Sequence, residues 1–272
     1  MREKRYAPRR RRPAAPTSWD ALARWYDGWV GEGGSEHHQR VAIPAVMRLL
    51  DLKSGDRVLD VGAGQGVLAQ FVARKGGRFV GIDASPRLLE MARQRHGKQG
   101  TFLLGDARRI PEMDELDAAS FDAVVFLLSL QDMDPLEPVL AGAAWALKPA
   151  GKTVILLTHP AFRIPRQSGW GWDEGRKLMY RRVDRYKTPL PVPMKAYPGK
   201  EQKGVTRSFH RPIEAYVNLL GDNGLLVDRM DEVPGYGLGG EERTNKAAAA
   251  ARREIPLFLG IRARKLGQYL TS

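Results

Sequence analysis

The alternation of strand-like and helix-like segments between residues 57 and 158 constrains this fold more than any other feature of the sequence. Short apolar stretches alternate with segments in which apolar residues recur at helical spacing. The expected strands are 57–61, 78–82, 101–104, 122–128 and 153–158, with helices at 67–74, 86–95 and 135–147. Ser85 is expected to cap the helix that begins at Pro86. Such alternation predicts a parallel, doubly wound α/β sheet.

The alternation is interrupted after residue 158. Residues 160–205 are rich in proline, basic residues and aromatics, and 173–186 are predicted to form one helix among them. Helical spacing returns at 212–220 and 247–253, and further strands are expected at 225–230 and 257–263. Two amphipathic helices are expected before the first strand, at 19–29 and 41–50. The sequence therefore predicts one domain over 17–272, with 160–205 as an insertion after the fifth strand.

Positive charge is concentrated in two segments of the chain. Of the net charge of +13, residues 1–12 contribute +6 and residues 160–213 contribute +9, while the remainder carries −2. Such segments attract phosphates, carboxylates, RNA or anionic membranes, so both are candidate nucleic-acid contacts. Residues 1–16, rich in arginine and proline, are expected to be disordered. The alternative to nucleic-acid binding by this tail is that it only adds solubility and binds no ligand.

The composition also indicates the cellular location of the protein. An apolar run of 18 residues is absent, and the basic N-terminus is not followed by an apolar signal segment. The chain has no cysteine, which excludes disulfides, thiolate nucleophiles and cysteine-based zinc sites. A cytoplasmic protein without a membrane span is expected.

A glycine-rich turn follows the first expected strand, in the segment VLDVGAGQG at 58–66. Glycines allow the backbone to approach a ligand closely and to adopt angles that a Cβ forbids. Turns that bind NAD read G-x-G-x-x-G, whereas here the third glycine, Gly66, comes one residue earlier. The turn therefore predicts a cofactor site of a different kind.

Three acids end three consecutive expected strands: Asp60, Asp83 and Asp106. Open α/β sheets bind ligands at the carboxyl ends of their strands. An acid at the position of Asp83 can accept both hydroxyls of a ribose, and Asp106 is placed to receive the exocyclic amine of an adenine.

Five segments, VLDVGAGQG, GIDAS, GDA, FDAVVFLLSLQDM and LKPAGKTVIL, resemble class I S-adenosylmethionine-dependent methyltransferases of the small-molecule group. The resemblance covers roughly 19–159 and 206–265. It implies a Rossmann-like sheet of seven strands whose last strand, 258–265, is antiparallel. Ala150 stands where the family usually has glycine. The cofactor contacts that the resemblance implies are Tyr26, Asp60, Gly62, Ala63, Gly64, Gly66, Asp83, Ala84, Asp106, Ala107 and Leu128.

Few catalytic groups are needed for such a reaction, because the methyl group of S-adenosylmethionine is already activated. The protein has to align a nucleophile, exclude water and in some cases remove a proton. Candidate bases are His159, Asp132 and His210, each with a structural role as the alternative, and no metal site is expected. The loop 128–133 lacks the pattern of enzymes that methylate nucleobase amines, and the absence of cysteine excludes the covalent route to 5-methylpyrimidines.

The insertion 160–205 is expected to cover the substrate, unless its aromatics only pack on one another. Candidate substrate contacts are Phe162, Arg163, Trp170, Trp172 and Arg211. An aromatic and cationic lid suits an aromatic or anionic acceptor. The function expected is methyl transfer from S-adenosylmethionine to an oxygen or nitrogen of such a small molecule. The alternatives are an RNA- or ribosome-associated methyltransferase anchored by the basic tail and lid, and a cofactor-binding protein without turnover.

Overall fold

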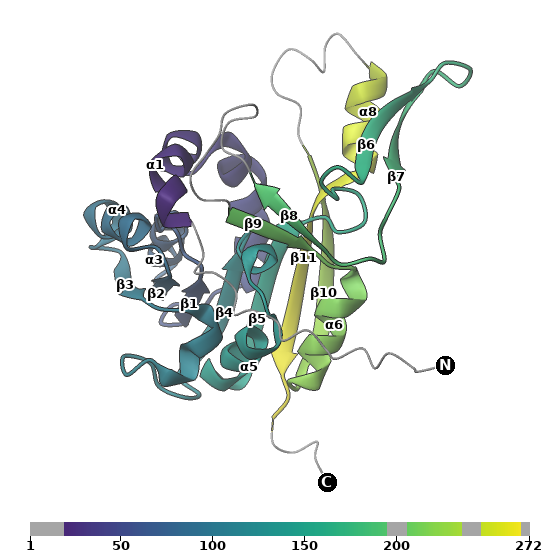
Figure 1. Cartoon of the computed structure of the whole chain (residues 1–272). Helices are drawn as coiled ribbons and strands as arrows, with labels where there is room; N and C mark the ends of the chain where they lie inside the picture. Colours follow the sequence, from purple (N-terminus) through teal and green to yellow (C-terminus); the bar gives the residue numbers. More distant parts are fainter. Residues whose placement is uncertain (1–18, 195–205, 236–245, 268–272) are drawn as a thin grey trace, which may run out of the picture.

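A twisted, seven-stranded sheet forms the centre of the protein, shown as a computed structural model in Figure 1, which describes residues 19–194, 206–235 and 246–267. Within these ranges the strand order is β10-β11-β5-β4-β1-β2-β3. The strands are β1 Arg57–Val61, β2 Arg78–Asp83, β3 Gly100–Leu104, β4 Phe121–Leu127, β5 Leu147–Thr158, β10 Leu225–Pro234 and β11 Pro256–Lys265. The first five pair in parallel, and β11 runs antiparallel to β5 and β10. The predicted fold class is confirmed.

Helices cover both faces of the sheet. They are α1 Trp19–Val30, a π-helical turn His38–Ala42, α2 Ile43–Leu50, α3 Ala69–Arg74, α4 Pro86–His96, α5 Glu137–Ala146, α6 Ile213–Asp222 and α8 Lys246–Glu254, with 3₁₀ turns η2 Ala107–Glu112 and η3 Leu130–Asp132. The hydroxyl of Ser85 accepts the Leu88 amide, so the predicted cap of α4 is confirmed. None of the helices described is long and apolar enough to cross a membrane.

Two apolar cores lie on opposite faces of the sheet. Successive side chains of β4 alternate between them, since Val124 and Phe126 belong to one core and Val125 to the other. The first core also holds α5 and α6, and the second holds α2, α3 and α4. This two-sided burial explains why β4 reads as a continuous apolar run.

The insertion after β5 forms strands, so the helix predicted at 173–186 is wrong. Strands β6 Ser168–Asp173 and β7 Leu178–Val183 form an antiparallel hairpin, and β8 Leu190–Met194 pairs with β9 Thr206–His210. Glycine and tryptophan alternate in β6, and the ring of Tyr180 fills the space over Gly171, where a Cβ would lie 2.4 Å from the ring. The Asp173 carboxylate accepts the Arg176 amide and closes the turn.

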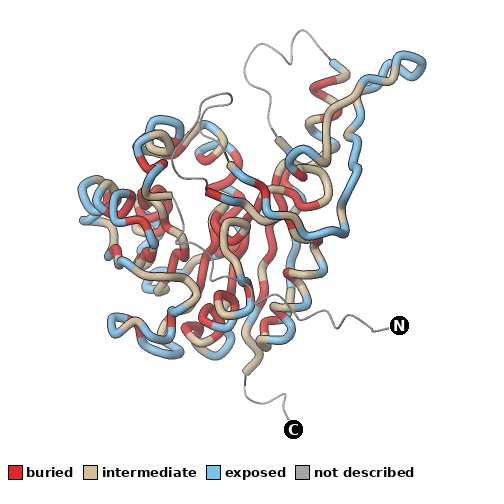
Figure 2. The backbone as a smooth tube through the Cα atoms, viewed as in Figure 1, coloured by how far each residue is buried: buried red, intermediate tan, exposed pale blue. Residues whose placement is uncertain are grey.

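The two parts of the insertion lie in different places. The β6–β7 hairpin projects beyond the body of the protein, beside α8, while the β8–β9 ribbon crosses the upper end of the sheet (Figure 1). Most of the hairpin is exposed or half-buried, in contrast to the buried central strands (Figure 2). The predicted tail 1–16 and residues 195–205 of the predicted lid lie outside the described residues, and the domain boundaries stay a prediction.

Candidate functional site

The glycine-rich turn after β1 has backbone angles that would be strained for a residue with a Cβ. Gly62, Gly64 and Gly66 all have positive φ angles, of +76°, +55° and +80°. A Cβ on Gly62 would lie 2.6 Å from Ser129, and one on Gly66 would lie 2.6 Å from the Phe102 ring. The turn is therefore built tightly against its neighbours, and its predicted position at the carboxyl end of β1 is confirmed.

Two carboxyl groups lie beneath this turn. Asp60 is 2% exposed, and its Oδ1 has no hydrogen-bond partner among the described residues. Burial, and then the nearby Asp83, raise the pKa of Asp60 to about 8. Asp83 accepts the amides of Gly64 and Ser85, each at 2.8 Å, yet burial still raises its pKa. Both groups would gain from a cation bound beside them.

Helix α1 brings Tyr26 to the same place. A Cβ on Gly64 would lie 3.8 Å from the ring of Tyr26. The pKa of the Tyr26 hydroxyl is raised by burial and then by the charges of Asp132, Asp83 and Asp60, so the phenol lies among three carboxyl groups. The cofactor contact that the resemblance implies for Tyr26 stays a prediction.

Ion pairs hold α1 on α4. Arg95 pairs with Asp27 through two hydrogen bonds, the longer of 3.0 Å. At the other end, Asp20 accepts the hydroxyl of Ser85 at 3.0 Å and the amide of Arg87 at 3.1 Å. These contacts fix the helix that carries Tyr26.

Asp132 is the third carboxyl of the site and lies in η3, after β4. Burial raises its pKa to about 7, although hydrogen bonds from Ser208 and Trp19 act in the opposite direction. Its Oδ1 has no partner among the described residues. Ser208 belongs to β9 and Trp19 to α1, so these two elements meet over Asp132. Neither Ser208 nor Trp19 was among the residues expected from the sequence.

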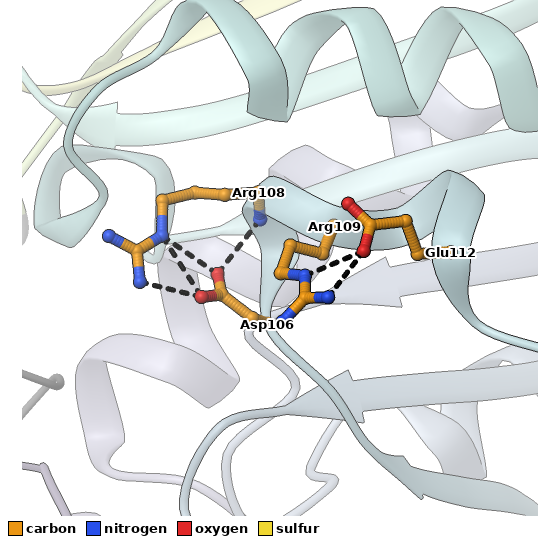
Figure 3. Close-up of polar contacts among 4 residues, drawn as sticks. All are labelled: Asp106, Arg108, Arg109 and Glu112. Atoms are coloured by element: carbon orange, nitrogen blue, oxygen red, sulfur yellow. Dashed lines mark hydrogen bonds and ion pairs between the residues drawn. The ribbon is translucent and has the colours of Figure 1, made fainter.

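Asp106 follows β3 and is paired with a cation, as Figure 3 shows. The Arg108 guanidinium donates to both carboxylate oxygens, at 2.6 to 3.0 Å, and its amide donates at 2.9 Å. Hydrogen bonds from Arg108 lower the pKa of Asp106. The neighbouring Arg109 pairs with Glu112 instead. An adenine amine would therefore share the Asp106 carboxylate with Arg108 or displace it.

Comparisons with known proteins decide the family. A model described as a methyltransferase domain matches residues 59–155. The demethylmenaquinone methyltransferase of Tropheryma whipplei (strain Twist) is 37% identical over 119 residues, which are 43% of this chain and 48% of that protein. The demethylmenaquinone methyltransferase of Thermobifida fusca is 32% identical over 165 residues, 58% of this chain and 67% of that protein.

The chain belongs to the class I S-adenosylmethionine-dependent methyltransferases. It spans about half the length of the first curated relatives that it matches. The ubiquinone biosynthesis O-methyltransferase of Xanthomonas oryzae pv. oryzae (strain PXO99A) is 34% identical over 139 residues, 50% of this chain and 56% of that protein. The fold is shared with an S-adenosylmethionine-dependent methyltransferase of Mesorhizobium loti, which is 24% identical, with a TM-score of 0.66 over 86% of this chain and all of the other.

The residues of this methyltransferase fit S-adenosylmethionine. The cofactor carries an ammonium and a sulfonium, and the site offers three carboxyls, Asp60, Asp83 and Asp132, whose pKa values are raised by burial. The Oδ1 atoms of Asp60 and Asp132 are buried without a partner among the described residues. The turn at 62–66 provides the close backbone approach that the methionine part requires. The contacts expected at Ala63, Ala84, Ala107 and Leu128 lie on the turns that follow β1, β2, β3 and β4, and these contacts stay predictions.

The two histidines of the predicted site have partners away from Asp132. His159 is buried at the end of β5, where its Nδ1 accepts the Ala161 amide and its Nε2 lies 3.0 Å from Glu232 of β10. His210 donates from Nε2 to the carbonyl of Tyr186 at 2.7 Å. Burial lowers the pKa of both imidazoles. These are the contacts of structural histidines, and a catalytic role for either stays a prediction.

Four of the predicted substrate residues lie at the hairpin. Trp170 stacks between Arg163 and Arg181, whose guanidinium carbons are 5.0 and 5.1 Å from its ring. Arg163 also donates to the carbonyls of Pro256 and Ile255, and Phe162 packs on His159. Trp172 lies farther out and is exposed. These contacts attach the hairpin to the start of β11.

Arg211 is the predicted substrate residue that the structure attaches to the loop directly after η3. It donates to the carbonyl of Met133 at 3.0 Å and to Asp134 at 2.7 Å. Its Nη1 is buried and has no partner among the described residues. Tyr216 of α6, which the sequence did not single out, lies near enough for the charges of Arg211 and Asp132 to act on the pKa of its hydroxyl, which burial raises. Among the residues described, no cluster of metal-ligating side chains occurs.

Proposed function

We propose that this chain transfers a methyl group from S-adenosylmethionine to an oxygen or nitrogen of a small anionic or aromatic molecule. Family membership supports the reaction class. The observation that carries the proposal is Asp132, whose Oδ1 is buried without a partner among the described residues and whose charge acts on the Tyr26 hydroxyl together with those of Asp83 and Asp60. The bound cofactor supplies the activated methyl group, so the chain itself has to bind, orient and deprotonate the acceptor.

Asp132 is suited to accept the acceptor's proton. A general base works best when its pKa lies near the working pH, and a carboxyl with a pKa of about 7 is partly ionised at neutral pH. Trp19 and Ser208 act on the carboxylate by lowering its pKa, against the effect of burial. A sulfonium beside Asp132 would favour its ionised form, so we expect the base to be ready once cofactor is bound.

Arg211 is suited to hold an oxygen of the acceptor. Among the described residues, its Nη1 is a buried donor without a partner, and the Oδ1 of Asp132 is a buried acceptor without one. A carboxylate or carbonyl oxygen of an acceptor would satisfy the Arg211 donor, and an O–H or N–H group would satisfy the Asp132 oxygen. Two curated relatives have names that refer to quinones, and the carbonyl oxygens of a quinone ring are acceptors that Arg211 can bind.

A methyl-transfer assay with hydroxylated aromatic acids and quinols tests this role. The Asp132→Asn variant should bind S-adenosylhomocysteine as the parent does but lose about 10²–10⁴-fold in kcat, the usual contribution of a general base. Asp114→Asn, at an exposed position outside the site, is the matched control. Undiminished turnover by Asp132→Asn would rule out Asp132 as the base.

The alternatives from the sequence predict different results in the same assay. A cofactor-binding protein without turnover would bind S-adenosylhomocysteine and methylate no acceptor. An RNA-directed enzyme would bind oligonucleotides with a steep salt dependence; Arg163 and Arg181, which anchor the hairpin, would contribute little to that binding. The tail 1–12 lies outside the described residues. A cytoplasmic location remains part of the proposal.

A further inference from the structure

The β6–β7 hairpin exposes large apolar side chains on both of its faces. The described residues include eight exposed large apolar side chains, of which the hairpin carries four: Trp172, Leu178, Tyr180 and Val183, each 39 to 47% exposed. Soluble proteins leave such groups in water mainly where something binds them. The hairpin is therefore a candidate interaction surface.

The hairpin is held rigidly at its base, which presents these side chains outward. Arg181 donates to the carbonyl of Phe162 at 2.7 Å and to the hydroxyl of Ser168 at 3.0 Å. Its guanidinium and that of Arg163 enclose Trp170, and α8 packs against β7. The exposed residues Trp172 and Leu178 pair with Met179 and Asp173 next to the turn, so they lie at the outer end. Figure 1 shows this end standing clear of the body.

Basic side chains accompany the apolar ones. Residues 163–187 contain eight lysines and arginines against three acids. Arg176, Lys177 and Arg182 are exposed on the hairpin, and pairs with Glu174 and Asp184 neutralise part of this charge. Aromatic, aliphatic and basic residues together are typical of segments that lie in the interface of an anionic bilayer.

We propose that the β6–β7 hairpin docks on an anionic lipid surface. Leu178 and Tyr180, which alternate with Met179 and so share one face of β7, enter the interface, while the basic side chains extend their charges to the lipid headgroups. The aliphatic Leu178 favours lipid over nucleic acid, since single strands bind by stacking on aromatic rings. The hairpin follows β5, whose carboxyl end lies at the same edge of the sheet as Asp132, so docking turns this edge toward the bilayer (Figure 1).

A fluorescent label tests the docking directly. Because the chain has no cysteine, Lys177→Cys places a single environment-sensitive dye in the hairpin turn. Met230→Cys, at an exposed position on β10, is the matched control. With vesicles of equal parts phosphatidylcholine and phosphatidylglycerol, the dye at 177 should shift to shorter wavelength and the dye at 230 should not. Vesicles of phosphatidylcholine alone should bind about tenfold or more weakly, since each basic residue near an anionic surface contributes about fivefold.

Paired substitutions separate the hairpin from the basic tail, which also attracts anionic vesicles. Leu178→Ser with Tyr180→Ser should reduce vesicle partitioning about tenfold or more. Leu226→Ser with Met230→Ser, at comparably exposed positions on β10, should leave it unchanged. An unshifted dye at 177 on vesicles that bind the chain overturns the proposal, because binding then comes from another segment. Loss of affinity for single-stranded oligonucleotides in the hairpin variant, without a dye shift on vesicles, overturns it in favour of nucleic acid.

Discussion

Replacing Gly66 with alanine should destabilise the protein by an amount that the structure separates into two parts. The φ angle of Gly66 is +80°, and a left-handed backbone costs a residue with a Cβ about 1–2 kcal/mol. The new Cβ would lie 2.6 and 2.8 Å from two atoms of the Phe102 ring and 3.2 Å from the Cβ of Ala92. Overpacking of this kind costs about 1–3 kcal/mol. The free energy of unfolding should fall by about 2–5 kcal/mol in total.

Urea denaturation followed by circular dichroism measures this loss. Gly31→Ala is the matched control, because Gly31 has a similar φ of +73° with no atom within 4 Å of its Cβ position; it should lose only about 1–2 kcal/mol. Combining Gly66→Ala with Phe102→Leu should recover part of the steric cost, giving a coupling of about 0.5–3 kcal/mol. Equal losses for Gly66→Ala and Gly31→Ala, with no coupling to residue 102, would refute the tight packing of this turn.

Two further predictions concern the charges of the cofactor site. The pKa of Asp60 is raised to about 8 in the folded protein, so the folded state holds a proton that the unfolded state releases above about pH 4. The free energy of unfolding without cofactor should therefore fall as the pH rises from about 4 to 8. When the urea midpoint is measured against pH, Asp60→Asn should flatten this part of the curve. We expect the adenine amine to bind the Asp106 carboxylate, which Arg108 already occupies. Arg108→Gln should therefore tighten S-adenosylhomocysteine binding severalfold in calorimetry, while Arg109→Gln should not change it. Weaker binding by Arg108→Gln would show that Arg108 positions Asp106 for the ligand.

The part of the fold between residues 57 and 158 could be predicted because its signals are local. Apolar periodicity, the glycine turn and the Ser85 cap each depend on a few neighbouring residues. The hairpin could not be predicted as easily, since Leu178–Val183 is short and fits either a helix or a strand. The alternation of glycine and tryptophan in Ser168–Asp173 was the signal that favoured a strand.

The residues of the candidate site likewise include some that the sequence could predict and some that it could not. The strand ends and their acids, Asp60, Asp83 and Asp106, follow from spacing along the chain. The contacts of Asp132 do not, because Trp19 and Ser208 come from opposite ends of the sequence and meet only in the folded protein. The pairing of Asp106 with Arg108 is close in sequence, but spacing alone does not show which of two adjacent arginines turns back to the acid.

Because the insertion is divided into a hairpin and a ribbon, substitutions can accumulate in one part during evolution without changing the other. The ribbon reaches the site through Ser208, while the hairpin is anchored by Arg163 and Arg181 on the far side of β5. Substitutions at the hairpin's outer end touch neither Asp132 nor the glycine turn. Selection can thus alter where such an enzyme resides in the cell while its chemistry stays the same, and can alter its acceptor without moving it.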